Sequence, residues 1–240
     1  MATYQIKLKS RNEVASGTMA FHFEKPGGFL FQPGQCGDFT LLNPPQTDAE
    51  GDKRSFSLAC APYENELIIA TRMRDTAFKR SLKAIDLGTE LTLEAPWGEL
   101  TLHDDAQIPA VFLTGGIGIT PVRSIVLQAT HDRQAHPLFL FYSNRTPHDA
   151  AFLDELTAAQ DRNPNFTFIA TMTEMDKSST QWKGETGYIT EAMLKKYLPD
   201  LNRPIYYITG PPEMVAAMQK LLKTAGVKET NIRAEEFSGY

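Results

Sequence analysis

A glycine-rich turn near the middle of the chain has the residue types to hold a phosphate group. Residues 113–121, LTGGIGITP, follow an apolar run of strand length and precede a segment with helical periodicity. Glycines after a buried strand let the backbone approach a ligand that a Cβ atom would block. Thr120 is expected to be the N-cap of the helix and Pro121 its first residue. The free N–H groups and positive dipole end there favour a pyrophosphate. The alternative is a tight turn around a packed glycine.

A second candidate lies in the first half of the chain, at residues 53–58, KRSFSL. Strand alternation places Arg54 and Phe56 on one face, so a charge and an aromatic plane lie together. This pair suits a phosphate beside a flat ring. Ser57 points to the other face in a regular strand, and it can reach the same ligand only at a strand end or a bulge. The alternative is a half-buried edge strand without a ligand.

The third candidate is near the carboxyl end, where residues 206–212, YYITGPP, end a strand with Gly210 and start a helix with two prolines. This arrangement repeats the first turn, and α/β sheets bind ligands at the carboxyl ends of their strands. The alternative is a plain helix start. The chain ends in residues 234–240, AEEFSGY, and an aromatic terminal residue such as Tyr240 usually belongs to a frayed tail.

Short strands must position the second candidate. Apolar and polar residues alternate in six short runs before residue 95, and Gly, Pro and Asn separate these runs. Such spacing predicts a small antiparallel barrel or sandwich, interrupted by one helix over residues 77–85. The expected strands cover residues 5–8, 18–23, 38–42, 56–59, 67–72 and 90–94.

From about residue 109, apolar runs of strand length alternate with helical periodicity. Strands that are apolar throughout and joined by helices indicate a parallel sheet covered on both faces. The polar stretch 103–107 is the expected boundary, which gives a β domain over residues 1–104 and a Rossmann-like α/β domain over residues 105–240. The expected strands are 110–113, 138–142, 166–171, 205–208 and 232–234, and the expected helices are 121–130, 150–160, 191–197 and 212–225.

The composition excludes several classes of protein. The 240 residues include 29 acidic and 24 basic side chains, and the net charge of −5 argues against a sequence-independent nucleic-acid binder. With 22% charged and 10% aromatic residues, the chain is expected to be globular and not disordered. No apolar run approaches the ~18 residues of a membrane span, and the amino terminus lacks a signal-peptide core.

Cysteine and histidine usage limits the metal chemistry. Cys36 and Cys60 are too few for a four-thiolate iron–sulfur cluster or a cysteine-rich zinc site. We expect both to be small buried hydrophobic residues and the protein to be cytoplasmic. The five histidines show no metal-ligand spacing, so no metal is expected, and the chain has no Gly-Lys-Ser/Thr phosphate loop.

Together the three motifs resemble those of the ferredoxin–NADP reductase superfamily. Residues 54–57, RSFS, resemble its Arg-x-aromatic-Ser flavin strand; residues 115–121, GGIGITP, its nicotinamide-side turn; and residues 210–214, GPPEM, its Gly-Pro-Pro-x-Met turn. The resemblance implies an antiparallel flavin-binding β-barrel followed by an NAD(P)-binding α/β domain. It also implies an FAD-dependent reductase that takes hydride from NAD(P)H and passes electrons to a separate ferredoxin, flavodoxin or oxygenase component. Related alternatives are a ferric or flavin reductase and a non-catalytic nucleotide-binding docking subunit.

The resemblance also assigns roles to individual residues. Arg54 would pair with a flavin phosphate, Phe56 would lie against the isoalloxazine ring, and Ser57 would hydrogen-bond its polar edge. Arg72 would end the strand beside the flavin. The pyrophosphate would lie at residues 76–81, TAFKRS, where side-chain cations and helix N–H groups take the place of the glycines of other members. The residues expected to contribute there are Thr76, Lys79 and Ser81.

The nicotinamide nucleotide would lie against the two glycine turns, on Thr114, Gly115, Gly116, Thr120, Gly210 and Pro211. Many family members have Cys before Gly-Pro-Pro, where this chain has Thr209. Glu235 or Glu236 resembles the acidic residue near the carboxyl end of many relatives. The residues expected near the reacting atoms are therefore Ser57, Thr209 and Glu235. Tyr240 resembles the terminal aromatic residue that covers the flavin in some members.

The choice between NADH and NADPH depends on the end of the second strand of the α/β domain, where the adenosine ribose lies. Residues 143–145, SNR, contain no acid to bind a 2′-hydroxyl, and the Arg145 guanidinium suits a 2′-phosphate. The sequence therefore favours NADPH. The alternative is that Arg145 is a solvated loop residue, with Asp149 opposing a phosphate. FAD is favoured over FMN because the chain resembles the compact FAD-binding members.

Overall fold

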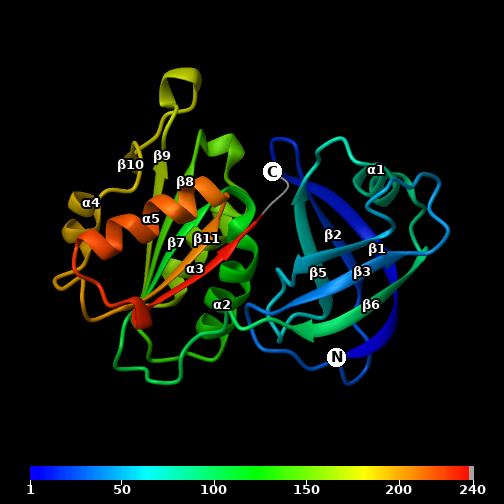
Figure 1. Cartoon of the computed structure of the whole chain (residues 1–240), viewed down its shortest axis with the longest axis horizontal. Coiled ribbons are helices and arrows are strands. Elements are labelled where there is room, and N and C mark those ends of the chain that lie inside the picture. Colours follow the sequence, from blue (N-terminus) through cyan, green and yellow to red (C-terminus); the bar gives the residue numbers. More distant parts are fainter. Residues whose placement is uncertain (238–240) are drawn as a thin grey trace.

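The computed structural model describes residues 1–237 and contains two sheets that lie side by side (Figure 1). The first sheet and helix α1 (Ala77–Ala84) form the half that carries the amino terminus. The second sheet and four helices form the other half. The β-barrel therefore precedes the α/β domain, as the sequence predicts. This fold class is confirmed. The predicted division between residues 104 and 105 falls in the connection between the two sheets and stays a prediction.

The first sheet is antiparallel throughout, with the strand order β4-β3-β6-β1-β2-β5. Its two edge strands come together, because the Ala59 N–H, just after β4, donates to the Ile68 carbonyl of β5 at 2.8 Å. The closed sheet surrounds an apolar core that includes Phe21, Phe23 and Phe39. The strands are β1 (Ala2–Ala15), β2 (Thr18–Glu24), β3 (Cys36–Leu41), β4 (Lys53–Ser57), β5 (Glu66–Arg72) and β6 (Glu90–Trp97).

The second sheet is parallel in all its pairings, with the order β10-β9-β8-β7-β11-β12. The chain builds outward from β7 through β8 and β9, and then returns to the other side of β7 as β11. Such a reversal opens a crevice at the carboxyl ends of the two strands, where α/β proteins bind ligands. The strands are β7 (Ala110–Gly115), β8 (Leu138–Asn144), β9 (Phe166–Met172), β10 (Glu185–Thr186), β11 (Ile205–Gly210) and β12 (Ile232–Glu236).

Helices cover both faces of this sheet, as the continuous apolar runs of its strands predict. The face that carries Phe112 packs on α2 and α3, and the face that carries Val111 and Leu113 packs on α4 and α5. Alternate residues of β7 therefore enter two different cores, which explains why this strand is apolar at successive positions. The helices are α2 (Ile119–His131), α3 (Leu153–Arg162), α4 (Glu191–Tyr197) and α5 (Pro212–Thr224).

Several elements differ from their expected bounds, and β1 and α2 show the physical reasons. β1 extends over 14 residues, well beyond residues 5–8, because it pairs with β2 on one side and β6 on the other. A 3₁₀ turn over Gly116–Gly118 lets α2 begin at Ile119, with Gly118 as its N-cap. The prediction that Thr120 caps this helix is therefore wrong. The Thr120 hydroxyl lies inside the first turn and donates to the Ile117 carbonyl at 3.1 Å.

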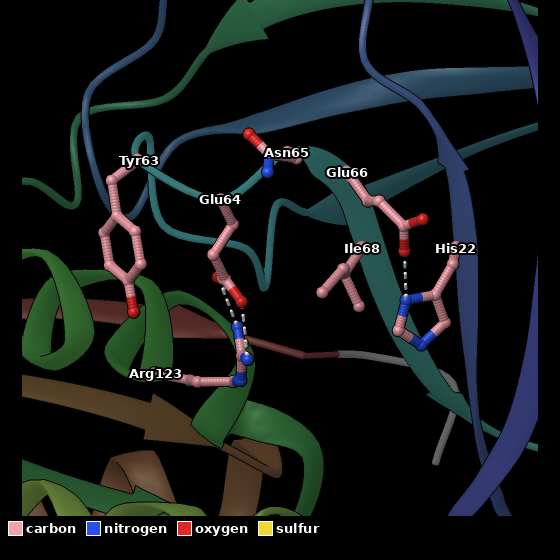
Figure 2. Close-up of a pocket in the computed structure, with 7 residues that line it drawn as sticks. All are labelled: His22, Tyr63, Glu64, Asn65, Glu66, Ile68 and Arg123. Atoms are coloured by element: carbon pink, nitrogen blue, oxygen red, sulfur yellow. Dashed lines mark hydrogen bonds and ion pairs between the residues drawn. The ribbon is translucent and has the colours of Figure 1, made fainter.

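A buried arginine joins the two halves. The side chain of Arg123 on α2 is 4% exposed. Its N–H groups donate to Glu155 of α3 at 2.7 Å, to Glu64 in the β4–β5 connection at 2.9 and 3.0 Å, and to the Ala59 carbonyl at 2.6 Å. Figure 2 shows Arg123 reaching from α2 to the Glu64 carboxylate. Burial alone would lower the pKa of Arg123, but the hydrogen bonds to Glu64 and Glu155 outweigh it and raise that pKa, so the group stays charged.

No helix within residues 1–237 is both long and apolar enough to cross a lipid bilayer. Over the same residues, no three His, Cys, Asp or Glu side chains gather into a group that could bind a metal ion. Cys36 and Cys60 are free and buried, as expected, and burial raises the pKa of each thiol to about 12.

Replacing Arg123 tests whether this buried arginine contributes more to stability than an exposed one does. Arg123→Met is expected to lower the free energy of unfolding by about 3 kcal/mol, because it leaves Glu64 and Glu155 close together without their shared cation. Chemical denaturation followed by circular dichroism measures this change. Arg162→Met, at an exposed position on α3, is the control and should cost less than about 0.5 kcal/mol. Equal stability of the two variants would contradict the role of Arg123.

Candidate functional site

A cleft of about 470 Å³ beside the first sheet, here called the barrel cleft, collects most of the residues predicted to bind a flavin. Arg54, Phe56 and Ser57 come from β4. Thr76 and Lys79 come from the amino end of α1, where the Thr76 hydroxyl accepts from the Lys79 N–H as the N-cap. The other lining residues are Glu50, Ser55, Ala70, Thr71, Ile117, Thr120 and Phe237, of which only Thr120 was selected from the sequence.

One wall of the barrel cleft is apolar and held by ring packing. The Phe56 ring centroid lies 5.8 Å from that of Phe39 and 5.9 Å from that of Phe78, and both of these rings belong to the barrel core. Ser57 is the last residue of β4, and its buried side chain lines the same cleft as Arg54 and Phe56. The end of the strand therefore allows Ser57 to join residues that strand alternation would separate from it.

Two cations also line the barrel cleft, and each already has a partner. Arg54 donates to three backbone carbonyls between residues 50 and 53 and to the Glu50 carboxylate at 2.8 Å. The Lys79 ammonium donates to the Arg72 carbonyl at 2.8 Å. Burial, together with the charges of Arg74 and Arg54, lowers the pKa of Lys79. An anion placed in this cleft would oppose this effect, because an opposite charge stabilises the charged form of Lys79.

A second cleft, of about 980 Å³, lies at the carboxyl edge of the parallel sheet and is here called the sheet cleft. Residues at or just after the ends of β7, β8 and β11 line it, as the reversal of strand order predicts. The lining residues that the sequence assigned to the nicotinamide nucleotide are Gly115, Gly116, Arg145 and Pro211. Arg72, which the sequence placed beside the flavin, lines this cleft and not the barrel cleft. Those that sequence reasoning did not select include Arg74, Asn144, Glu174, Tyr188, Glu213 and Met214. Met214 belongs to the GPPEM motif and could have been selected, whereas no motif surrounds Tyr188.

Glycines allow backbones to touch at this edge of the sheet. A Cβ atom at Gly118 would lie 2.6 Å from the carbonyl group of Thr209, and one at Gly115 would lie 2.2 Å from the Met214 sulfur. Gly210 has a φ of 153°, which L-residues rarely adopt, and a Cβ atom there would lie 3.2 Å from the Gly115 backbone. Gly118 and Gly210 are therefore required by the backbone around them, independently of any ligand, whereas a Cβ atom at Gly115 would have to displace the flexible Met214 side chain.

Two neighbouring residues at the end of β8 line the sheet cleft and carry polar groups with few partners in the chain. Asn144 is buried beside Tyr142, yet among residues 1–237 neither atom of its side-chain amide has a partner in good hydrogen-bond geometry. The Arg145 side chain is 57% exposed, and Asp149 lies 3.6 Å from it. The Asp149 carboxylate already accepts a hydrogen bond from the Thr146 hydroxyl at 2.7 Å. Arg145 is therefore available to a ligand. Its neighbour Asn144 is one of the residues that sequence reasoning missed.

The two clefts adjoin at two steps of the backbone. In β5, Thr71 lines the barrel cleft and the next residue, Arg72, lines the sheet cleft. In the turn after β7, Gly116 lines the sheet cleft and the next residue, Ile117, lines the barrel cleft. Consecutive Cα atoms are ~3.8 Å apart, so at these two steps the clefts lie on either side of the same stretch of backbone.

Several of the predicted residues line neither cleft. Thr114 and Thr209 are fully buried, and their hydroxyls hydrogen-bond each other at 3.1 Å between β7 and β11. Ser81 is also buried, and its hydroxyl donates to the Gln46 carbonyl at 3.0 Å. Gly210, as above, packs on the end of β7. Tyr240 lies outside the described residues.

Glu235 lies in β12, in register with Thr209 of β11. Burial raises the pKa of the Glu235 carboxyl. Its charge contributes, after burial, to the raised pKa of Cys36, which pairs with Ser57 across β3 and β4. The Glu235 carboxyl is therefore near the end of β4, and Phe237, two residues further on, lines the barrel cleft.

Comparison with proteins of known sequence agrees with this geometry. Residues 112–220 match the family described as the oxidoreductase NAD-binding domain. The reductase component of propane 2-monooxygenase from Rhodococcus jostii is 30% identical over 220 residues, which are 89% of this chain and 57% of that protein. The glycine betaine monooxygenase reductase subunit from Chromohalobacter salexigens is 28% identical over 224 residues, which are 92% of this chain and 60% of that protein. The chain therefore spans less than two thirds of the length of these relatives.

Solved structures match almost the whole chain. The flavohem-like FAD/NAD binding domain of nitric oxide dioxygenase from Vibrio cholerae superposes with a TM-score of 0.83 at 18% identity, over 97% of this chain and 98% of that one. A ferredoxin NADP⁺ reductase from Neisseria gonorrhoeae, with bound FAD and NADP, superposes with a TM-score of 0.79 at 20% identity, over 98% of each chain. This chain has the ferredoxin–NADP reductase fold. The fold that the three sequence motifs indicate is confirmed, and the barrel cleft and the sheet cleft belong to its two halves.

The close approach of Gly118 to β11 in this ferredoxin–NADP reductase fold can be tested directly. Gly118→Ala is expected to destabilise the protein by about 2 kcal/mol, because its Cβ atom would overlap the Thr209 carbonyl group. Gly27→Ala is the control, since no atom lies within 4 Å of a Cβ atom built there, and its effect should stay within about 0.5 kcal/mol. Thermal unfolding of the two variants measures the difference. A Gly118→Ala protein as stable as the parent would show that this contact is not limiting.

Proposed function

We propose that this chain is an FAD-dependent reductase that takes a hydride from NAD(P)H and passes electrons to a separate acceptor. The observation that carries the proposal is the contact between the two clefts, where Thr71 and Ile117 face one cleft and Arg72 and Gly116 face the other. Hydride transfer requires two reacting rings held together in one orientation. A structure of the same fold with bound FAD and NADP supports this assignment of the clefts.

The residues of the barrel cleft fit a flavin. Phe56 offers an apolar plane, and Ser57, beside it, offers a hydroxyl to the polar edge of a ring. Arg54 and Lys79 offer cations to phosphate groups. The lowered pKa of Lys79, caused mainly by burial, indicates a position that would gain from a bound anion.

The residues of the sheet cleft fit a nicotinamide nucleotide. Gly116 leaves open space in this cleft, because a Cβ atom there would meet only the Arg72 guanidinium, at 3.9 Å. Asn144 presents a buried amide whose hydrogen-bonding capacity is unused within residues 1–237. Arg145 presents an exposed guanidinium at the strand end where the adenosine ribose of such a nucleotide lies. On this ground we propose NADPH as the preferred donor.

When bound, the two cofactors supply the hydride donor and acceptor, and the protein positions and shields them. Phe56 and Ile117 exclude water from the barrel cleft on two sides. Burial raises the pKa of Glu235, whose carboxyl lies near the Ser57 end of β4. Thr209 acts indirectly. Its hydroxyl is bonded to Thr114 and so holds the ends of β7 and β11 in register.

The proposed acceptor is an oxygenase component, because both relatives named above are reductase parts of monooxygenases. Cys36 and Cys60 cannot bind a cluster of the four-cysteine type. The electrons must therefore leave to a group outside these 240 residues. We also propose a cytoplasmic location, since two buried free thiols suit a reducing compartment.

Anaerobic mixing of the FAD-loaded protein with NADPH, and separately with NADH, tests the function. We expect rapid loss of the flavin absorbance with at least one donor, because the adjoining clefts bring the two rings together. Stopped-flow spectroscopy measures the rate. Flavin absorbance that persists with both donors would contradict hydride transfer and favour a non-catalytic nucleotide-binding module.

The donor preference can be tested separately. Arg145→Ala is expected to raise the KM for NADPH about tenfold and to leave the KM for NADH nearly unchanged, because only the phosphorylated ribose needs the guanidinium. Steady-state kinetics with both donors provide the measurement. Arg162→Ala, which removes an exposed arginine on α3, is the control. An unchanged KM for NADPH in the Arg145 variant would exclude this role.

A further inference from the structure

The connection between β3 and β4 carries carboxylates beside the barrel cleft. Residues 42–52, LNPPQTDAEGD, are here called the acidic loop. The loop is docked on α1, since the buried Ser81 hydroxyl donates to the Gln46 carbonyl at 3.0 Å and the Arg80 guanidinium donates to the Gln46 side chain at 2.8 Å. These contacts hold the acidic end of the loop over the amino terminus of α1.

Asp48 of the acidic loop takes an anion position at this helix. One of its carboxylate oxygens accepts from the N–H of Ala77, the first residue of α1, at 3.2 Å. The first turn of α1 contains no acidic residue of its own. The N–H groups at a helix amino terminus favour negative charge. Asp48 thus fills the place that the sequence assigned to a flavin pyrophosphate.

The same loop also engages Arg54, the other group expected to bind a flavin phosphate. The Glu50 carboxylate lies 2.8 Å from the Arg54 guanidinium, and the Asp48 carboxylate lies 3.5 Å from it. Glu50 itself lines the barrel cleft. Both cationic features at this end of the cleft are therefore occupied by carboxylates of the chain itself.

We propose that Asp48 and Glu50 compete with flavin phosphates for Arg54 and the amino terminus of α1, and so set the affinity for phosphorylated flavins. The proposal rests on the function proposed above. The Asp48 side chain is 35% exposed and the Glu50 side chain is 74% exposed. Exposed ion pairs are weak and exchange readily, and a pyrophosphate can replace them with stronger charge-assisted hydrogen bonds. A flavin without phosphate gains nothing from their removal.

Fluorescence titration of the apoprotein with FAD and with riboflavin tests the competition. Asp48→Asn and Glu50→Gln should each tighten FAD binding about threefold, and the double variant about tenfold. Riboflavin binding should not change, because riboflavin carries no phosphate. Asp52→Asn is the matched control: it removes the same charge from the same loop, while the ion pairs of Arg54 are with Asp48 and Glu50. Its FAD affinity should stay close to that of the parent.

The possible outcomes separate this inference from the function on which it rests. FAD binding that is unchanged or weakened in both the Asp48 and Glu50 variants would overturn the competition alone. An equal gain for riboflavin, or for Asp52→Asn, would also overturn it, because the effect would then be one of general charge or loop mobility. Failure of the parent and of every variant to bind either flavin would overturn the proposed function and the competition together.

Discussion

Arg123 fixes how the two halves of the molecule face each other, and both clefts depend on it. Its carbonyl partner, Ala59, lies just after β4, and its partner Glu64 lies in the segment that leads into β5. These strands supply half of the residues that line the barrel cleft, while the turn that leads into α2, the helix of Arg123, forms part of both clefts. A guanidinium this deeply buried is tolerated only when its N–H groups are bonded and its charge is balanced. Ser124 adds a bond to the Cys60 carbonyl at 2.6 Å, so the angle between the halves has little freedom.

A second constraint acts within the α/β half, where the ends of β7 and β11 nearly touch. Gly118 leaves no space for a side chain against the Thr209 backbone, and Gly210 has a φ that favours glycine. Thr209 suits this position because its short side chain is fully buried and its hydroxyl is satisfied by Thr114. A buried hydroxyl without a partner would be costly. Thr209 therefore does not line the sheet cleft, and it affects that cleft only through the backbone of β7 and β11.

The sequence predicted those features that depend on local pattern, and missed those that depend on contacts between distant segments. Strand alternation correctly grouped Arg54 with Phe56, and the apolar runs correctly indicated a parallel sheet. The cap of α2 was misplaced because a 3₁₀ turn precedes it, and residue types alone do not distinguish Gly118 from Thr120 as the first capping position. Arg123 gave no signal, since its partners lie 32 and 59 positions away. The same holds for the contact of Asp48 with the start of α1, 29 positions along the chain.

The two clefts differ in how they hold charge, and this difference bears on what each can bind. In the barrel cleft, Arg54 and Lys79 already have partners within the chain, so a ligand must exchange those contacts, and its net gain comes largely from placing a ring against Phe56. In the sheet cleft, Arg145 is exposed, so a phosphate can bind without displacing a strong partner. Burial of apolar surface contributes strongly to binding free energy, whereas exposed ion pairs contribute little. Differences in affinity appear mostly in the rate of dissociation. A ring packed against Phe56 is therefore expected to leave more slowly than a phosphate held by Arg145 alone.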